Sequence, residues 1–262
     1  MSAKKVLITG TSGLVGGILY EHLSQFPERY AVYGLDWKRA ASDPGSPGRT
    51  LPDDRFYLGD VADFDAVQGA VDGKDLVVHM AANADPEADW EAVLSSNIIG
   101  SYTVLEASRK AGVERVVNAS SIMVNWGCRR DPETRAVEEA AEEDLPAAIP
   151  QVTHLSEVRP DCLYGASKVW VETLSRAYAE AHGMSVICVR VGAINKTDEN
   201  AACQRSWWCS YGDIARMIEC CIEAPADVRF DIFYGLSANP WRWMDLDHAK
   251  AVVGFEPVDR AQ

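Results

Sequence analysis

A glycine-rich turn near the N-terminus constrains the fold of this chain more than any other feature. A short apolar run at residues 6–9 leads directly into Gly10-Thr11-Ser12-Gly13-Leu14-Val15-Gly16. The spacing is one residue wider than in the standard GxGxxG fingerprint, but the small residues again let the backbone approach a pyrophosphate. The helix that follows offers free N–H groups and the positive end of its dipole. We therefore expect a strand, a turn and a helix that bind a dinucleotide through Gly10, Ser12, Gly13, Leu14, Val15 and Gly16.

An acidic residue after the second apolar run supports this interpretation. Asp36 follows Gly16 by 20 residues and closes the run at residues 30–35. A carboxylate in this place accepts hydrogen bonds from the adenosine ribose hydroxyls. Because it would also repel a 2′-phosphate, the expected cofactor is NAD rather than NADP, although Lys38 and Arg39 weaken this preference slightly. The glycines alone could form an ordinary turn, but the strand, the helix and the spaced acid occur together.

Apolar, strand-like segments alternate with helical ones along the whole chain. The expected strands occupy residues 6–9, 30–35, 55–58, 76–79, 116–118, 186–189 and 230–233. The expected helices occupy residues 14–26, 63–71, 89–111, 163–181, 214–223 and 245–252, with a loop at 39–54. Repeated β-α-β units predict a Rossmann-like α/β fold, a doubly wound parallel sheet. We expect one NAD-binding domain over residues 1–262, with a small C-terminal substrate cap mainly in residues 193–262.

A tyrosine and a lysine at helical spacing are the main candidates for catalysis. Tyr164-Gly165-Ala166-Ser167-Lys168 opens the helix expected at residues 163–181, and positions i and i+4 share one face of a helix. A nearby ammonium favours the phenolate and lowers the pKa of a tyrosine. Tyr164 could then take a proton from a hydroxyl while hydride leaves the same carbon. The alternative is a purely structural role, in which this stretch is a surface turn that leads into an ordinary helix.

Composition excludes several classes of protein. The net charge is −14, so the chain lacks the excess of Lys and Arg that phosphate backbones attract, and we expect no nucleic-acid partner. No apolar run approaches the roughly 18 residues that cross a bilayer, so we expect no membrane partner either. The seven cysteines show no paired CxxC spacing. This favours reduced thiols in a cytoplasm and predicts neither a disulfide framework nor a metal site.

Together these motifs resemble the extended short-chain dehydrogenase/reductase family, the NAD-dependent epimerases and dehydratases, over nearly the whole chain. The resemblance implies that Ser121, the second of two serines after the fifth strand, is catalytic and bonds the reacting oxygen, alongside Tyr164 and Lys168. It also implies that Tyr164 and Lys168 contact the cofactor as well as the glycine turn does. Further cofactor contacts are implied at Asp60, Val61, Met80, Ala81, Ala82 and Asn97. The role of Asn97 could equally be structural, and Ser121 could merely satisfy the backbone.

Within that family the C-terminal part is similar to uronate dehydrogenases and to the haloarchaeal NAD-dependent glucose-6-phosphate dehydrogenase. Those enzymes oxidise the anomeric carbon of an aldose. The substrate positions of this subgroup fall in this chain on or near Ala84, Ile122, Met123, Arg205 and Trp207. Polar residues of the subgroup are replaced there by apolar ones, and such a change should sharply alter substrate choice.

The leading hypothesis is an NAD-dependent dehydrogenase that oxidises the anomeric or a secondary hydroxyl of a sugar-like small molecule. One alternative is an NDP-sugar epimerase with tightly bound NAD, and another is a regulator that senses NAD without turnover. The residues do not name the substrate. Release of NADH in excess over enzyme would separate the first two hypotheses.

Two further expectations concern surfaces. The helices at 89–111 and 164–181 carry apolar residues on more than one face, which predicts burial on both sides and a homodimer. The acidic segment 128–160 joins the catalytic serine to the tyrosine helix and is too long for a simple connection, so we expect a lid-like loop with at most a short helix. His154 in this segment is either a substrate contact or a solvated loop residue.

Overall fold

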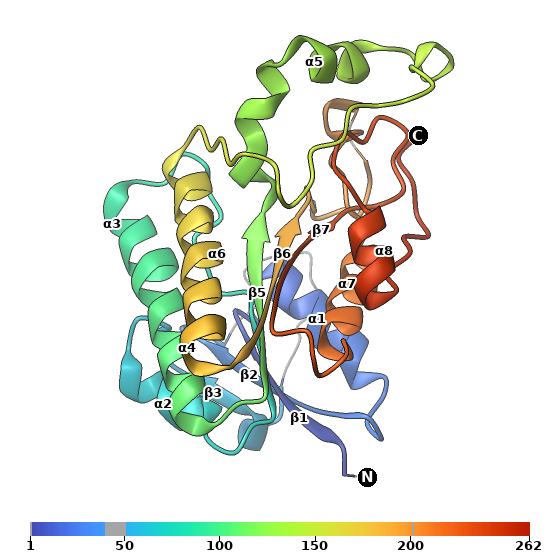
Figure 1. The fold of residues 1–262 in the computed structure, drawn as a ribbon. Helices are drawn as coiled ribbons and strands as arrows, with labels where there is room; N and C mark the ends of the chain where they lie inside the picture. Colours follow the sequence, from blue (N-terminus) through green and yellow to red (C-terminus); the bar gives the residue numbers. More distant parts are fainter. Residues whose placement is uncertain (1, 40–50, 201) are drawn as a thin grey trace.

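A computed structural model describes residues 2–39, 51–200 and 202–262, and it contains a parallel sheet in the order β3-β2-β1-β4-β5-β6-β7 (Figure 1). The strands are β1 Lys4–Thr9, β2 Tyr30–Asp36, β3 Phe56–Leu58, β4 Leu76–His79, β5 Arg115–Ser121, β6 Ser185–Val191 and β7 Phe230–Gly235. Every neighbouring pair runs parallel. The doubly wound sheet expected from the sequence is confirmed. Residues 40–50 of the expected loop lie outside the described residues.

Helices cover both faces of the sheet, and each face has its own core. The main covering helices are α1 Leu14–Ser24, α2 Phe64–Val71, α4 Gly100–Ala111, α6 Leu163–His182, α7 Tyr211–Ile222 and α8 Asp247–Val253. In Figure 1, α2, α4 and α6 lie on one face, and α1, α7 and α8 lie on the other. Successive side chains of a strand point to opposite faces, so Val6 and Ile8 pack with α1 and α7, whereas Leu7 packs with α2 and α4.

The order in which strands are added to the sheet reverses beside β1. From β1 the next strand in sequence, β2, lies on one side, and β4 lies on the other. Loops that leave the two strands in opposite directions open a crevice at their carboxyl ends, where ligands of open α/β sheets bind. The turn at Gly10 and the segment after His79 both begin at this crevice.

The long helix expected at residues 89–111 contains a local change of winding. It consists of α3 Trp90–Val93, the π-helix η2 Leu94–Ile99 and α4, which ends at Gly112 in a left-handed conformation (φ 70°). Asn97 in the π segment is buried, and its amide bonds both backbone groups of Asn83 at 2.8 and 3.0 Å. π segments are frequent at functional sites, and this one anchors the segment that leaves β4.

The segment expected as a loop at 128–160 is more helical than the sequence indicated. It contains the end of the 3-10 helix η3 Ile122–Arg130, then α5 Pro132–Glu139 and the short η4 Glu142–Asp144. Proline at the start of α5 and Glu133 in its first turn suit a helix N-terminus, and Val137 is buried. In Figure 1, α5 lies beyond the carboxyl ends of β5 and β6. Two further 3-10 turns are η1 Asp53–Arg55 and η5 Ala202–Gln204.

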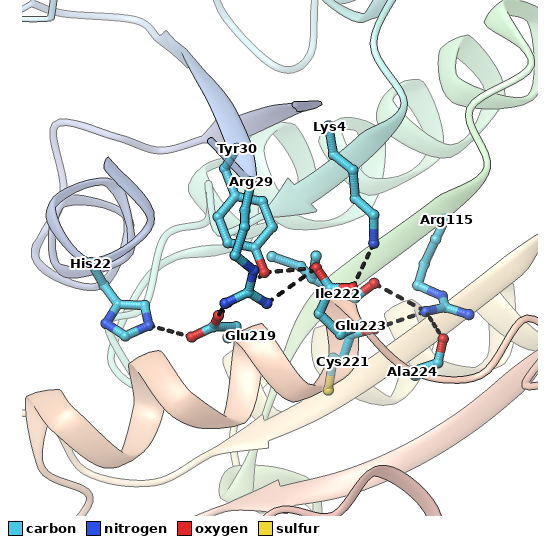
Figure 2. Close-up of polar contacts among 10 residues, drawn as sticks. All are labelled: Lys4, His22, Arg29, Tyr30, Arg115, Glu219, Cys221, Ile222, Glu223 and Ala224. Atoms are coloured by element: carbon cyan, nitrogen blue, oxygen red, sulfur yellow. Dashed lines mark hydrogen bonds and ion pairs between the residues drawn. The ribbon is translucent and has the colours of Figure 1, made fainter. Parts of the chain in front are cut away.

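Polar contacts anchor the C-terminal end of α7 at the end of the sheet where the strands begin (Figure 2). Glu219 pairs with Arg29 at 2.6 Å, and Glu223 pairs with Lys4 at 2.6 Å. The buried Arg115 donates to three carbonyls around the C-terminus of α7, at 2.7 to 3.2 Å. A cation at this end complements the helix dipole. As a result, α7 is anchored to the main layers of the domain.

Candidate active site

The glycine turn forms a cradle that only small residues permit. Gly10 has a φ of +75°, and a Cβ there would lie 2.8 Å from the backbone nitrogen of Ala81. A Cβ on Gly16 would overlap the carbonyl oxygen of Gly10. Gly13 is the N-cap of α1 and brings no side chain to the first N–H groups of the helix. These groups are therefore available to a pyrophosphate, and the residues present fit a dinucleotide.

Asp36 stands at the end of β2 and is oriented by the glycine turn. Its carboxylate accepts hydrogen bonds from the backbone of Ser12 at 2.8 Å and of Lys38 at 3.3 Å. Burial raises the pKa of Asp36, and these backbone donors oppose that rise. A cavity of about 230 Å³ extends from Asp36 along the crevice. It is lined by Gly10, Gly13, Asp36, Trp37, Gly59, Asp60, Val61, Met80, Ala81, Ala82 and Ser96.

Ser121, Tyr164 and Lys168 meet where β5 and α6 begin to separate. Ser121 is the last residue of β5, its hydroxyl accepts from the backbone N–H of Met123 at 3.2 Å, and its side chain interacts with the phenol of Tyr164. The Lys168 ammonium donates to the carbonyl of Ala119 at 2.7 Å and lies 5.7 Å from the centre of the Tyr164 ring. The neighbouring Ser120 is engaged elsewhere, because its hydroxyl donates to Glu172 at 2.6 Å. Of the two serines, Ser121 is thus the one that faces the tyrosine.

The electrostatics differ from the sequence expectation in one respect. We expected Lys168 to lower the pKa of Tyr164, but burial raises it, opposed by the hydrogen bond with Ser121. Burial also lowers the pKa of Lys168 to about 8. The ammonium is directed at a carbonyl of β5 rather than at the phenol, and desolvation disfavours both charged forms. In this structure Lys168 therefore does not bring the pKa of Tyr164 below its ordinary value.

The three residues open onto a second cavity of about 480 Å³. Its lining includes Ala84, Ile122, Met123 and Trp207, which were expected to contact substrate, and also Val15 of α1. The remaining lining residues are Met80, Ala82, Pro86, Ala119, Ser120, Ser121, Trp126, Tyr164, Lys168, Val191, Gly192, Ala193, Ile194 and Gln204. Met80 and Ala82 also line the cavity beside Asp36, so the two cavities meet along the segment that follows β4.

Five of the expected site residues line neither cavity: Ser12, Leu14, Gly16, Asn97 and Arg205. Ser12 and Gly16 belong to the glycine turn described above, and the other three make contacts elsewhere. Arg205 donates to the carbonyls of Glu138 and Ala140 at 2.7 and 2.8 Å, and so holds the end of α5. Asn97 is bound to Asn83 and Ser167 instead of facing the crevice. Leu14 opens α1 and packs against the apolar core.

Two features of the site were not anticipated from the sequence. Gln204, the last residue of η5, lines the reaction cavity, and its surroundings in the sequence carry no recognisable pattern. Behind Ser121, a buried ion pair joins Glu172 of α6 to Arg190 of β6 at 2.8 Å, and Arg190 also donates to Asn125 at 2.6 Å. Glu172 follows Lys168 by one helical turn, and this was the only local signal of the pair.

Comparison with known proteins places the chain in a family. Residues 6–194 match the model of the NAD dependent epimerase/dehydratase family. The chain is 33% identical to the NAD-dependent glucose-6-phosphate dehydrogenase of Haloferax volcanii, covering 98% of this chain and 94% of that protein. It is also 33% identical to the L-arabinose 1-dehydrogenase (NAD(P)(+)) of the same organism, covering 98% and 97%.

A solved structure agrees with the sequence comparison. The chain superposes on a mutant of uronate dehydrogenase from Agrobacterium tumefaciens complexed with NAD, with a TM-score of 0.77 and 29% identity. The match covers 99% of this chain and 86% of that one. No helix in the described ranges is both long and apolar enough to span a membrane. The expected enzyme class and cofactor are confirmed: the chain belongs to the NAD-dependent epimerase/dehydratase family and is an NAD-dependent dehydrogenase of the extended short-chain type.

Proposed function

We propose that this enzyme oxidises a ring hydroxyl of a neutral, sugar-like compound and passes the hydride to NAD. The observation that carries the proposal is the convergence of Ser121, Tyr164 and Lys168 on one cavity that continues into the cavity at Asp36. The reaction cavity has room for a monosaccharide, and the cavity at Asp36 follows the glycine turn. The relatives named above, which act on sugars by their names, support the same chemistry.

The proposed roles follow from the contacts of each side chain. Ser121 holds the reacting oxygen by a hydrogen bond, and Tyr164, whose pKa the Ser121 side chain lowers against the effect of burial, takes the proton of the hydroxyl as general base. Lys168 stabilises the phenolate that forms and orients the start of α6 through Ala119. NAD, when bound, accepts the hydride from the same carbon. Asp36 holds the adenosine ribose, and the N-terminus of α1 holds the pyrophosphate.

The lining of the reaction cavity supports a neutral substrate. Among the described residues that line it, Lys168 is the one with a charged side chain, and its ammonium is already bound to Ala119. A carboxylate or phosphate on the substrate would lose its hydration there and would meet only this ammonium, already bonded to Ala119, so the loss would be poorly compensated. Ala84, Ile122 and Met123 offer apolar contacts instead. A neutral aldose therefore suits this cavity better than a uronate or a sugar phosphate.

Steady-state kinetics with a matched panel of substrates test the proposal. L-Arabinose and D-glucose should give a kcat/KM at least about tenfold above that of D-glucuronate or glucose 6-phosphate, since an unpaired buried charge costs more than 1.4 kcal/mol. Tyr164→Phe should reduce kcat by about 10²- to 10⁴-fold while the Kd for NAD stays unchanged. A preference for the anionic sugars would overturn the substrate class. A Tyr164→Phe variant with more than a tenth of the wild-type kcat would overturn the assignment of the base.

The same assay addresses the epimerase alternative. A dehydrogenase releases NADH in excess over enzyme, whereas an epimerase returns the hydride to its substrate and leaves no net NADH. We favour the dehydrogenase, because the three relatives and structures named above all carry that activity in their names. An NAD-sensing regulator would bind NAD and turn over none of the panel.

The segment 128–160 and the outer helices support two further proposals. We propose that the segment covers one side of the substrate: it lines a neighbouring cavity of about 530 Å³ that shares Trp126 and Trp207 with the reaction cavity. We also propose a homodimer through α4 and α6, where Tyr102 and Trp170 are exposed.

All seven cysteines are free, which suits a reducing compartment such as the cytoplasm.

A further inference from the structure

Two histidines and an aspartate meet at the edge of the sheet, away from the reaction cavity. They are His154 of the segment after α5, Asp231 of β7 and His248 of α8, and one donor atom from each lies within 4.8 Å of the others. His248 Nε2 is 2.7 Å from Asp231 Oδ1, and the rings of His154 and His248 stack with centroids 3.8 Å apart. The sequence did not indicate this group, because its members come from three separate elements.

One nitrogen of this group lacks a partner. His154 Nδ1 is buried and has no hydrogen bond, although buried polar atoms are nearly always satisfied. Burial and the neighbouring His248 lower the pKa of His154, and Asp231 and Asp245 oppose that shift. Neutral imidazole with an open nitrogen is the form that binds metal ions.

The backbone positions of all three residues are fixed. Asp231 and His248 lie on regular elements, whereas His154 sits in a turn closed by the hydrogen bond from the Thr153 backbone to Ser156 at 2.9 Å. A hydrogen bond connects this turn to the C-terminal part of the chain, because the backbone N–H of Val152 donates to the carbonyl of Trp243 at 2.7 Å. Ligands held in this way lose little further entropy when they bind an ion.

We propose that His154, Asp231 and His248 bind a divalent transition-metal ion, with Zn²⁺ as the best-suited ion. Two imidazoles and a carboxylate form a common donor set for zinc, which takes nitrogen ligands at about 2.0–2.1 Å and leaves a fourth position for water. The carboxylate of Asp231 and that of the nearby Asp245, which caps the backbone of His248, supply the compensating negative charge.

Binding requires a small adjustment of the rings. An ion about 2 Å from each donor atom requires the donor atoms to lie about 3–4 Å apart. The three donor atoms now lie within 4.8 Å of one another, so they must move closer together. The nitrogen lone pair lies in the ring plane, and the rings are now nearly parallel, at 14°. One ring must therefore tilt toward the other, and the partly exposed His154 on its turn is free to make this motion.

The site would act as a structural clamp rather than in the reaction. None of its three residues lines the cavity that holds Tyr164. The ion would join the segment between α5 and α6 to β7 and α8, ten residues before Tyr164. It would stabilise the folded state without contributing to hydride transfer.

Metal titration of the EDTA-treated full chain tests this proposal. Calorimetry should show one Zn²⁺ bound per chain, and Co²⁺ should give the visible absorption of a tetrahedral site. His154→Gln, Asp231→Asn and His248→Gln should each weaken Zn²⁺ binding by at least about tenfold, since even outer partners of a metal site change affinity by 10- to 100-fold. At a hundredfold excess of Zn²⁺ over its Kd, the Tm of the wild type should rise by about 5 °C.

Two variants serve as matched controls. His22→Gln removes a histidine that also faces a carboxylate, Glu219 at 2.6 Å, but is not part of such a group (Figure 2). Cys203→Ser removes an exposed thiol that could capture the metal. Both should bind Zn²⁺ like the wild type, and NAD titration verifies that each variant is folded. The proposal is wrong if the wild type binds no Zn²⁺, or if binding is lost in Cys203→Ser and kept in the three ligand variants.

Discussion

At the scale of single residues, we propose that Asp36 selects which dinucleotide the crevice accepts. We expect Asp36→Ala to raise the Kd for NAD by about tenfold, because charge-assisted hydrogen bonds contribute about 1.5–3 kcal/mol. The Kd for NADP should change little or fall, since the variant removes a charge that repels the 2′-phosphate. Fluorescence titration with both reduced cofactors measures the two constants.

Asp36 also holds the Ser12 backbone, so a second variant is needed. Asp36→Asn keeps an acceptor for that N–H while it removes the charge. Its effect on NADP should therefore match that of Asp36→Ala, with a smaller loss for NAD. Equal losses for both cofactors in both variants would show that the residue acts only on the shape of the turn.

His79 makes the stability of the domain depend on pH. Its ring is buried at the end of β4, with Nδ1 2.7 Å from the Thr9 hydroxyl, and burial, reinforced by the Lys168 ammonium, lowers its pKa from 6.5 to about 3. Between these values the unfolded chain binds a proton that the folded chain does not, so stability falls as the pH falls from 6.5 toward 3.

We expect the wild type to lose about 2 kcal/mol more than His79→Asn between pH 7 and pH 5, because each pKa unit corresponds to about 1.4 kcal/mol. Asparagine retains a partner for Thr9 but does not titrate. Urea unfolding of both proteins at the two pH values gives the difference. If both proteins lose stability in parallel, His79 is not the group responsible.

At the scale of elements, the close contact between η3 and α6 places Tyr164 against Ser121. Gly165 follows Tyr164, and a Cβ at this position would lie 2.7 Å from the carbonyl oxygen of Met123. Gly165→Ala should thus push the start of α6 away from the end of β5. A displacement of this kind lowers kcat by about 10²-fold when reacting groups lose their alignment by about 1 Å.

A glycine in a different helix provides the control. A Cβ on Gly69 of α2 would meet nothing within 4 Å, so Gly69→Ala should keep kcat and raise stability slightly. Both variants should keep the Kd for NAD, because neither residue lines the cavity at Asp36. Unchanged kcat in Gly165→Ala would mean that the contact with η3 does not position the tyrosine.

At the scale of the whole molecule, the outer faces of α4 and α6 remain uncovered. Tyr102 of α4 and Trp170 of α6 are 48% and 41% exposed, so each of these two helices presents a large aromatic group to solvent. We expect light scattering at micromolar concentration to give a dimeric mass. Trp170→Lys should give a monomer, whereas Leu155→Lys, at an exposed residue outside these helices, should leave the mass unchanged. A monomeric wild type would contradict the proposed dimer.

The sequence alone indicated the fold class and the cofactor, and it paired Tyr164 with Lys168 as catalytic candidates, because these signals are local. The glycine turn follows a strand and opens a helix, Asp36 stands at a set distance from it, and Tyr164 and Lys168 are one helical turn apart. Each of these patterns depends on backbone geometry within a few residues or one β-α-β unit, which the order of residues specifies directly.

Only the tertiary structure decided what depends on burial and on contacts between distant segments. It directed Arg205 toward the carbonyls of Glu138 and Ala140 rather than toward the reaction cavity. It also raised the pKa of Tyr164, since desolvation is a property of the packed site and not of the motif. The same holds for the group at His154, whose three members are brought together by the sheet edge, a helix and a turn that no local pattern connects.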